Sequence, residues 1–186
     1  MIKIISKSLI ALLWGSLACG VIYPLMLTVF SQTFFRTQAN GSLVIDAQRN
    51  VLGSFLLGQK FTSDRFFSGR PSASDYETLP SGASNLSQAS TALREKINER
   101  AKQYRLAVSG TPADLLTASG SGLDPDISYE SAILQIPRIA SARKVPQARI
   151  AGIVRNLSRP QLPLFSKPRI VNVVMLNQAL EGDSSR

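Results

Sequence analysis

Residues Leu9 to Phe30 read LIALLWGSLACGVIYPLMLTVF, which is an almost wholly apolar run. No residue from Ser8 to Phe35 carries a charge. At the rise of an α-helix the run extends for about 33 Å, enough to cross the hydrocarbon core of a bilayer. We therefore expect residues 9–35 to form a transmembrane helix.

A cleaved signal peptide is the main alternative, because Lys3 and Lys7 form a short positive leader before the apolar run. The apolar part of a secretory signal is shorter, and here the run continues well past any small-residue cleavage point near Ala18. A lipoprotein signal acylated at Cys19 fits poorly, because Ser16 stands where such a site has a large aliphatic residue. These features favour a retained helix.

The charges that flank the run predict its orientation. Lys3, Lys7 and the amino terminus precede it, whereas only Arg36 follows it closely. The positive-inside rule then favours a cytoplasmic leader over residues 1–8 and an extracytoplasmic soluble domain over residues 36–186. Most of the net charge of +9 falls on that domain, so we expect it to contact lipid headgroups or an acidic partner rather than nucleic acid.

The composition excludes several classes of enzyme. The 186 residues leave room for one compact domain beside the helix. The sequence contains no histidine and a single cysteine, which rules out Ser/His/Asp and Cys/His triads, histidine-bound zinc and intrachain disulfides. We therefore expect no catalytic residue and no metal site in this chain.

Small side chains recur on one side of the predicted helix, at a spacing that lets a second helix approach closely. Pro24 would free a backbone carbonyl and bend the same helix. Both features favour packing against partner helices, although small residues are also common in single spans. The small residues are Ala11, Gly15 and Cys19, with Ser16 and Gly20 beside them.

Short strand and helix patterns follow in the soluble part. Two runs rich in strand formers, 41–45 and 50–57, could pair as a hairpin, and 170–176 reads as a final strand. Strands at both ends with helices between them predict a small α+β domain that closes on itself. The full prediction is one N-terminal transmembrane helix followed by this α+β domain.

Three helices are expected between these strands. The first spans about Thr91 to Ala107, where apolar residues recur at helical spacing. The second follows Ser128 as its N-cap and should be bent or split at Pro137. The third runs from Pro146 to Leu157.

A long loop is expected from Gly58 to Leu86, because this segment is dense in glycine, proline, serine and asparagine. Loops of this length in small domains are usually functional or form contact surfaces. Within it two arginines surround two aromatic residues, which we interpret as candidate contacts with a partner. These residues are Arg65, Phe66, Phe67 and Arg70.

Two further patterns suggest ligand sites but match them incompletely. The Gly/Ser-rich stretch 117–124 precedes a helix but lacks the lysine of a phosphate cradle, so a tight turn is favoured. Asp124 and Asp126 resemble the start of a calcium loop. Tyr129 and Gln135 occupy the positions where such a loop requires glycine and glutamate, so the aspartates are interpreted as turn and cap residues.

A series of short motifs occurs in order along nearly the whole chain. The motifs are Tyr23-Pro24, Gln38 to Leu43, Gly53-Ser54, Gly58 to Phe61, Phe66 to Ala73, Ser84 to Leu86, Leu116 to Asp124, Gln135 to Arg143, and Val171 to Val173 with Leu176-Asn177. Each motif is weak alone, but the series is specific. Together the motifs resemble the C subunit of the Kdp-type potassium-transporting ATPase of bacteria.

The resemblance implies a non-catalytic, single-pass subunit in the bacterial plasma membrane. Its partners would be a channel-like A subunit that passes potassium and a P-type B subunit that hydrolyses ATP. The family's C subunit is needed for assembly and is described as a catalytic chaperone that raises the B subunit's affinity for ATP. The resemblance implies no firmly bound cofactor. ATP would be bound through the complex, and Gln135 is the suggested contact with the nucleotide.

An extracytoplasmic domain conflicts with a contact to cytoplasmic ATP. We therefore favour a structural or gating role near the outer mouth of the channel subunit, with Gln135 as a polar side chain on a surface helix. The alternative is a single-pass binding module on the outer face, unconnected to transport.

Overall fold

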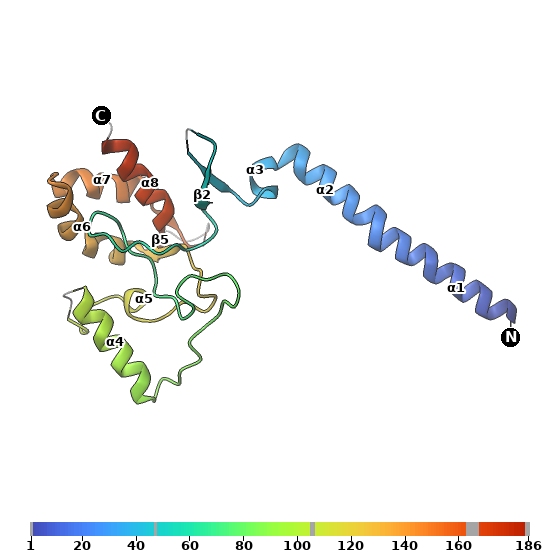
Figure 1. Cartoon of the computed structure of the whole chain (residues 1–186), viewed down its shortest axis with the longest axis horizontal. Helices are drawn as coiled ribbons and strands as arrows, with labels where there is room; N and C mark the ends of the chain where they lie inside the picture. The colour runs from blue at the N-terminus through green and yellow to red at the C-terminus, as the bar shows by residue number, and fades with distance from the viewer. Residues whose placement is uncertain (1, 47, 105–106, 163–167, 185–186) are drawn as a thin grey trace. The chain divides into compact units, whose positions relative to one another are not determined.

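The computed structural model describes residues 2–46, 48–104, 107–162 and 168–184 (Figure 1). The chain divides after Leu52 into an N-terminal unit and a larger C-terminal unit. Figure 1 shows the order of elements, an apolar helix followed by a small domain of helices and two small sheets. This is the expected α+β class with an N-terminal helix.

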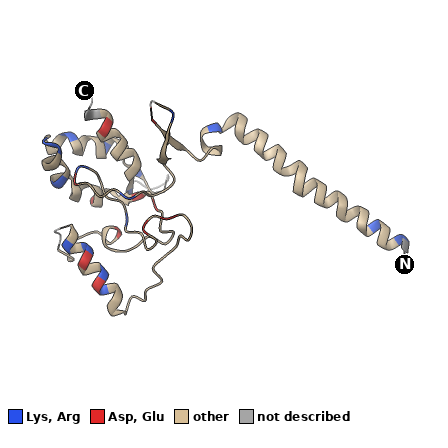
Figure 2. Cartoon of the chain, viewed as in Figure 1, with Lys and Arg blue, Asp and Glu red and all other residues tan. Residues whose placement is uncertain are grey.

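The N-terminal unit begins with three helical elements that follow one another without a break. They are α1 (Ile2–Leu17), the π-helical turn η1 (Ala18–Ile22) and α2 (Tyr23–Phe34). The stretch Lys3–Phe34 is long and apolar enough to cross a membrane. The colours in Figure 2 show that charged residues occur on this helix only near its start.

The π-helical turn shows how the helix accommodates Pro24. Proline has no N–H to donate, and its ring presses on the carbonyl four residues earlier, which is that of Gly20. The preceding turn widens, and the Tyr23 N–H donates to Ala18 O, five residues back. The helix therefore continues through Pro24 instead of breaking there.

A predicted hairpin follows the helix and is confirmed. After the single turn α3 (Arg36–Ala39), strand β1 (Leu43–Ile45) pairs with β2 (Val51–Ser54). At the turn the Asn50 backbone N–H and side-chain amide donate to the Asp46 carboxylate at 2.7 and 2.9 Å. The Asn50 side chain, and then its backbone, hold the pKa of Asp46 below its ordinary value.

The C-terminal unit contains a three-stranded antiparallel sheet and a group of helices. The strands β3 (Asp126–Ser128), β4 (Arg159–Pro160) and β5 (Arg169–Asn172) form the sheet in the order β3-β5-β4, and Ile127 lies opposite Val171. Residues 55–90, all of which the structure describes, contain no helix or strand, so the predicted loop is confirmed. The elements are α4 (Thr91–Gln103), α5 (Ala113–Leu116), β3 (Asp126–Ser128), α6 (Tyr129–Arg143), α7 (Gln147–Leu157), β4 (Arg159–Pro160), β5 (Arg169–Asn172) and α8 (Val173–Ser184).

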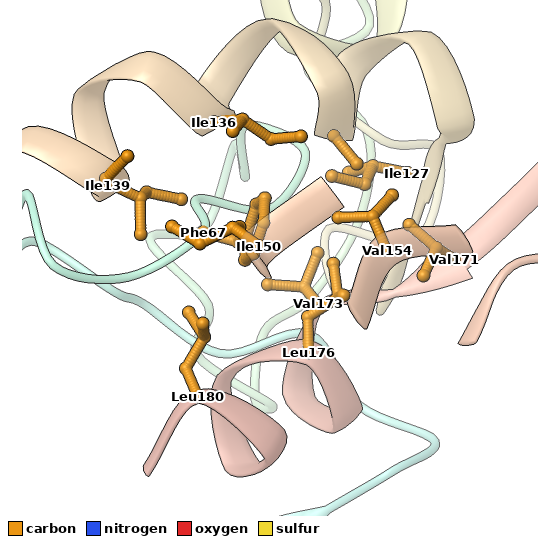
Figure 3. Packing of buried hydrophobic residues seen from close by; sticks show 12 residues of the cluster. Phe67, Ile127, Ile136, Ile139, Ile150, Val154, Val171, Val173, Leu176 and Leu180 are labelled. Atoms are coloured by element: carbon orange, nitrogen blue, oxygen red, sulfur yellow. The ribbon is translucent and has the colours of Figure 1, made fainter. Parts of the chain in front are cut away.

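The hydrophobic core lies among α6, α7, α8 and the sheet. Figure 3 shows side chains of α6 and α8 facing one another with Phe67 and Ile150 between them. Phe67 is fully buried, although it belongs to the long loop and not to a helix or strand. The fully buried residues of the cluster also include Ile127, Ala132, Ile139, Val154, Val171 and Leu176.

Three sequence-based expectations about these elements were wrong. The final strand ends at Asn172, because the Asn172 side chain accepts the Met175 N–H at 3.0 Å and caps α8. Helix α6 is not split at Pro137 but runs as one helix to Arg143, and its C-cap Lys144 adopts a left-handed conformation. The first and last strands belong to separate sheets, so they do not close the domain on itself.

The remaining helix predictions agree with the structure. Ser90 and Ser128 accept backbone N–H groups at the starts of α4 and α6, and Pro146 precedes the first residue of α7. Two short segments lie outside the described residues. They are residues 105–106, near the end of the first predicted helix, and residues 163–167, which precede β5.

Candidate functional site

The segment Arg65–Ser68 of the long loop is held by side chains from α6 and α8. It takes part in no β-sheet, yet its backbone groups are bonded one after another as a strand's would be. The side chains that hold it come from Gln135, Arg138 and Arg143 on α6 and from Asn177 on α8. We call these four residues and the segment they hold the loop clamp.

Gln135 supplies the first of two reciprocal pairs in the loop clamp. The Ser68 N–H donates to Gln135 Oε1 at 2.8 Å, and Gln135 Nε2 donates to Ser68 O at 3.1 Å. Nε2 also donates to Ser131 O at 3.3 Å, and Oε1 also accepts from Arg138 Nη2 at 3.0 Å. The side chain is buried and both polar atoms are engaged, so Gln135 is not the surface residue that was expected.

Asn177 makes the equivalent pair with the preceding residue. The Phe67 N–H donates to Asn177 Oδ1 at 2.8 Å, and Asn177 Nδ2 donates to Phe67 O at 3.0 Å. These partners are buried and lie 110 residues apart in the sequence. Two amide side chains thus satisfy four backbone groups, of which the Phe67 pair is buried and the Ser68 pair is partly buried.

Two arginines bond the carbonyls at the start of the segment. Arg138 Nη2 donates to Phe66 O at 3.0 Å, and Arg143 Nε donates to Arg65 O at 2.7 Å. The Arg143 guanidinium lies 5.2 Å from the centre of the Phe66 ring and also bonds Leu180 O at 2.9 Å. Because the Arg143 side chain is only 4% exposed, it acts inside the domain.

The structure separates the four residues that were expected to contact a partner. Arg65 is exposed, which fits that role, whereas Phe66 is half-buried against Phe61 and Arg143. Phe67 has no exposed surface and belongs to the core, so the expected partner contact is wrong for this residue. Arg70 is half-buried and donates to Asp124 Oδ2 at 3.0 Å.

The Gly/Ser-rich stretch 117–124 packs against the long loop. A side chain at Gly122, where φ is +75°, would lie 2.9 Å from Gly82 O. At Gly58 it would lie 2.7 Å from Asp124 O, and the Gly58 N–H donates to Leu123 O. The glycines therefore permit close contact between two backbones, as the preferred tight-turn interpretation requires.

The two aspartates of the calcium-like pattern bond elsewhere. Asp124 pairs with Arg70, and its other oxygen accepts the Asp126 N–H, while Asp126 accepts from Arg159 Nη2 at 2.8 Å. Among the residues that the structure describes, no group of three or more acidic, cysteine or histidine side chains could hold a metal ion. The aspartates hold turns and strand ends together.

A cavity of about 260 Å³ lies between the long loop, α4 and α6. Lys60, Arg100 and Arg138 line it together with Asp64 and Asp75, so both charges are represented. Tyr76 also lines it and donates its hydroxyl to Arg70 O at 2.7 Å. Burial is the main cause that raises the pKa of Tyr76 to about 12, and burial also lowers the pKa of Arg100.

The small residues expected to pack against partner helices lie on two kinds of helix. Ala11, Gly15 and Ser16 belong to α1, whereas Cys19 and Gly20 lie within the π-helical turn. A side chain at Gly15 or Gly20 would meet nothing within 4 Å. Both positions therefore have room for an approaching helix.

Comparison with known proteins identifies the family of this chain. A family model described as "KdpC: K+-transporting ATPase, c chain" matches residues 5–182. The chain belongs to the KdpC family. The resemblance found in the sequence motifs is thereby confirmed.

Relatives align with the chain over nearly its full length. A Pseudomonas aeruginosa protein named "Potassium-transporting ATPase KdpC subunit" is 45% identical over 183 residues, covering 98% of both chains. Proteins with the same name from Gloeobacter violaceus and Yersinia pseudotuberculosis are 43% and 42% identical, covering 92% and 95% of this chain. The aligned regions cover 91% and 92% of the lengths of those two relatives.

Within this KdpC family chain, the sequence motifs pointed to only part of the loop clamp. The motif 135–143 contains its three α6 residues, and Phe66–Ala73 contains much of the held segment. Asn177 was present in a motif but received no role. The predicted strand 170–176 covered the start of α8 and ended just before Asn177, so the sequence did not indicate that this side chain is buried on a helix.

Proposed function

We propose that this chain is an accessory subunit of an ATP-driven potassium transporter, without a catalytic role of its own, and that it serves the assembly and stability of the complex. The match to the KdpC family over residues 5–182 carries this proposal. Relatives with that full-length similarity are named as subunits of a potassium-transporting ATPase. The partners would be an ATP-hydrolysing B subunit and a potassium-channel-like A subunit.

The proposed location is the bacterial plasma membrane, crossed once by residues 9–35. We place the leader, residues 1–8, in the cytoplasm and residues 36–186 outside it. The support is the charge bias of Lys3 and Lys7 over Arg36 and the length of the apolar helix. This orientation places the soluble domain beside the outer face of the membrane subunits.

A direct contact between Gln135 and ATP has less support than a structural role. Both polar atoms of the Gln135 side chain already bond groups within the domain. To bind a nucleotide, the side chain would have to release the partly buried backbone groups of Ser68, which is unfavourable. We therefore propose that ATP acts through the B subunit, and that any effect of this chain on ATP affinity is exerted through assembly.

The proposal is tested by deleting the gene in its host and measuring growth on micromolar potassium. We expect growth to stop and to return when the gene is restored. A matched pull-down in mild detergent should recover an ATP-hydrolysing partner with the chain. Normal growth together with purification of the chain alone would favour the binding module unconnected to transport.

The orientation has its own test. A broad-specificity protease added outside intact spheroplasts should cut the long loop near its exposed residues 77–81. Full protection in intact spheroplasts, with cleavage only after lysis, would place the domain in the cytoplasm instead.

A further inference from the structure

One face of the β1–β2 hairpin is apolar and exposed. The Asp46 N–H donates to Asn50 O, which places Ile45 opposite Val51, and Leu43 shares their face because side chains alternate along a strand. Leu43, Ile45 and Val51 are between 40% and 59% exposed. Two strands of three and four residues form a hairpin too small to be stable alone in water. Exposed aliphatic side chains on one face of such an element indicate a contact surface.

The connection between the helix and the hairpin is short and folded back on the helix end. The Asn40 and Gln32 side-chain amides bond each other at 3.3 Å, although they lie eight residues apart. The Phe35 N–H donates to Ser31 O, and the Ser42 N–H donates to Thr37 O. Asn40 is therefore beside the last turns of α2, whatever the orientation of the span.

This fold-back limits how far the hairpin can lie from the end of the membrane helix. Leu43 follows Asn40 by three residues, which can extend at most about 10 Å. Gln32 lies near the end of the apolar stretch Lys3–Phe34. The headgroup and interfacial layer adds roughly 5–7 Å on each side of the hydrocarbon core, so the start of β1 falls within or next to that layer.

The distribution of polar groups on the hairpin suits the interfacial layer rather than the hydrocarbon core. The turn is polar, with the Asp46 carboxylate bonded to Asn50 and with Arg49 beside it. The outer edges of a two-stranded hairpin leave backbone N–H and C=O groups that need water. The interface offers both water for these groups and acyl chains for the aliphatic side chains.

We propose that the β1–β2 hairpin lies in the headgroup layer of the membrane and binds lipid through Leu43, Ile45 and Val51. It acts there as a second membrane attachment beside the transmembrane helix. The occupant of this surface is the lipid bilayer, and a protein surface of a partner subunit is the competing outcome. The inference requires the membrane span but does not depend on which transporter the chain joins.

The test places a nitroxide on the hairpin in the assembled complex. Val51→Cys and the matched turn variant Gln48→Cys are labelled on the full-length chain, assembled with unlabelled partners and reconstituted into phosphatidylethanolamine and phosphatidylglycerol vesicles. The unsubstituted chain, with Cys19 in the span, supplies the labelling background. Relaxation by oxygen, which enters lipid, is compared with relaxation by a water-soluble nickel chelate.

We expect the ratio of oxygen to nickel accessibility to be several-fold higher at position 51 than at position 48. If nickel dominates the relaxation equally at both positions, the hairpin lies in water and the proposal is overturned. Low accessibility to both reagents at position 51 would show burial against a partner protein, which also overturns it.

Discussion

Gln135 and Ser68 bond each other reciprocally, with the Ser68 N–H donating to Gln135 Oε1 at 2.8 Å and Gln135 Nε2 donating to Ser68 O at 3.1 Å. The bond joins α6 to a loop segment 67 residues away in the sequence. Together with the Asn177–Phe67 pair, it fixes a segment without secondary structure against the helices. The long loop is thereby part of the domain's framework.

Asn177→Ala should destabilise the domain strongly. The change leaves the buried N–H and C=O groups of Phe67 without partners, which costs about 2–4 kcal/mol. Gln178→Ala is the matched control, because Gln178 is the next residue on α8 and is exposed. Chemical denaturation of the full-length chain in detergent measures both. Equal stability of the two variants would contradict the role of Asn177.

Phe67→Ala should lower the free energy of unfolding by about 3–5 kcal/mol, because it opens a cavity in the core. Phe66→Ala should cost less than about 2 kcal/mol, since Phe66 is half-buried and loses only its contacts with Phe61 and Arg143. The same denaturation experiment compares them. If the Phe67→Ala variant were stable but failed to assemble, Phe67 would be a partner-contact residue after all.

Ionisation of Tyr76 should make the domain less stable in strongly alkaline solution. Its folded-state pKa of about 12 exceeds the ordinary value of 10.0, so the folded state holds the phenol proton more tightly. That contribution is fully present below pH 10.0 and is lost as the pH rises towards about 12. Phenolate absorbance and unfolding free energy should show this decline, and Tyr76→Phe should reduce it. An unchanged decline in Tyr76→Phe would assign it to other groups.

Gly15→Leu should weaken assembly of the complex without unfolding the soluble domain. The substitution adds bulk to the small face of α1, where an approaching helix would pack. Leu13→Phe adds bulk on a different side of the same helix and serves as the control. Co-purification from membranes in mild detergent measures both. Full recovery of partners with Gly15→Leu would remove the packing role of this face.

The elements that the sequence predicted well are those whose signals are local. Helices α4, α6 and α7 have apolar residues at helical spacing and nearby serine or proline at their starts. The hairpin has strand formers on either side of a polar turn. Such signals depend on neighbouring residues, so one sequence suffices to read them.

The elements that were predicted wrongly depend on distant contacts. The run 170–176 is rich in β-branched residues, and it turns into α8 because Asn172 caps that helix while also donating to Phe55 O at 2.8 Å. The loop clamp joins partners 67 and 110 residues apart. Nothing in the local pattern around Gln135 or Phe67 indicates that both are buried.

The ATP dependence of the reconstituted complex tests most directly whether Gln135 is structural. Gln135→Ala and Asn177→Ala each remove the side-chain partners of two backbone groups in the loop clamp, but only Gln135 is the suggested nucleotide contact. We predict that both variants reduce the yield of assembled complex to a similar extent and leave the KM for ATP of the assembled fraction unchanged. A KM for ATP raised tenfold by Gln135→Ala alone would contradict this and assign the side chain to nucleotide binding.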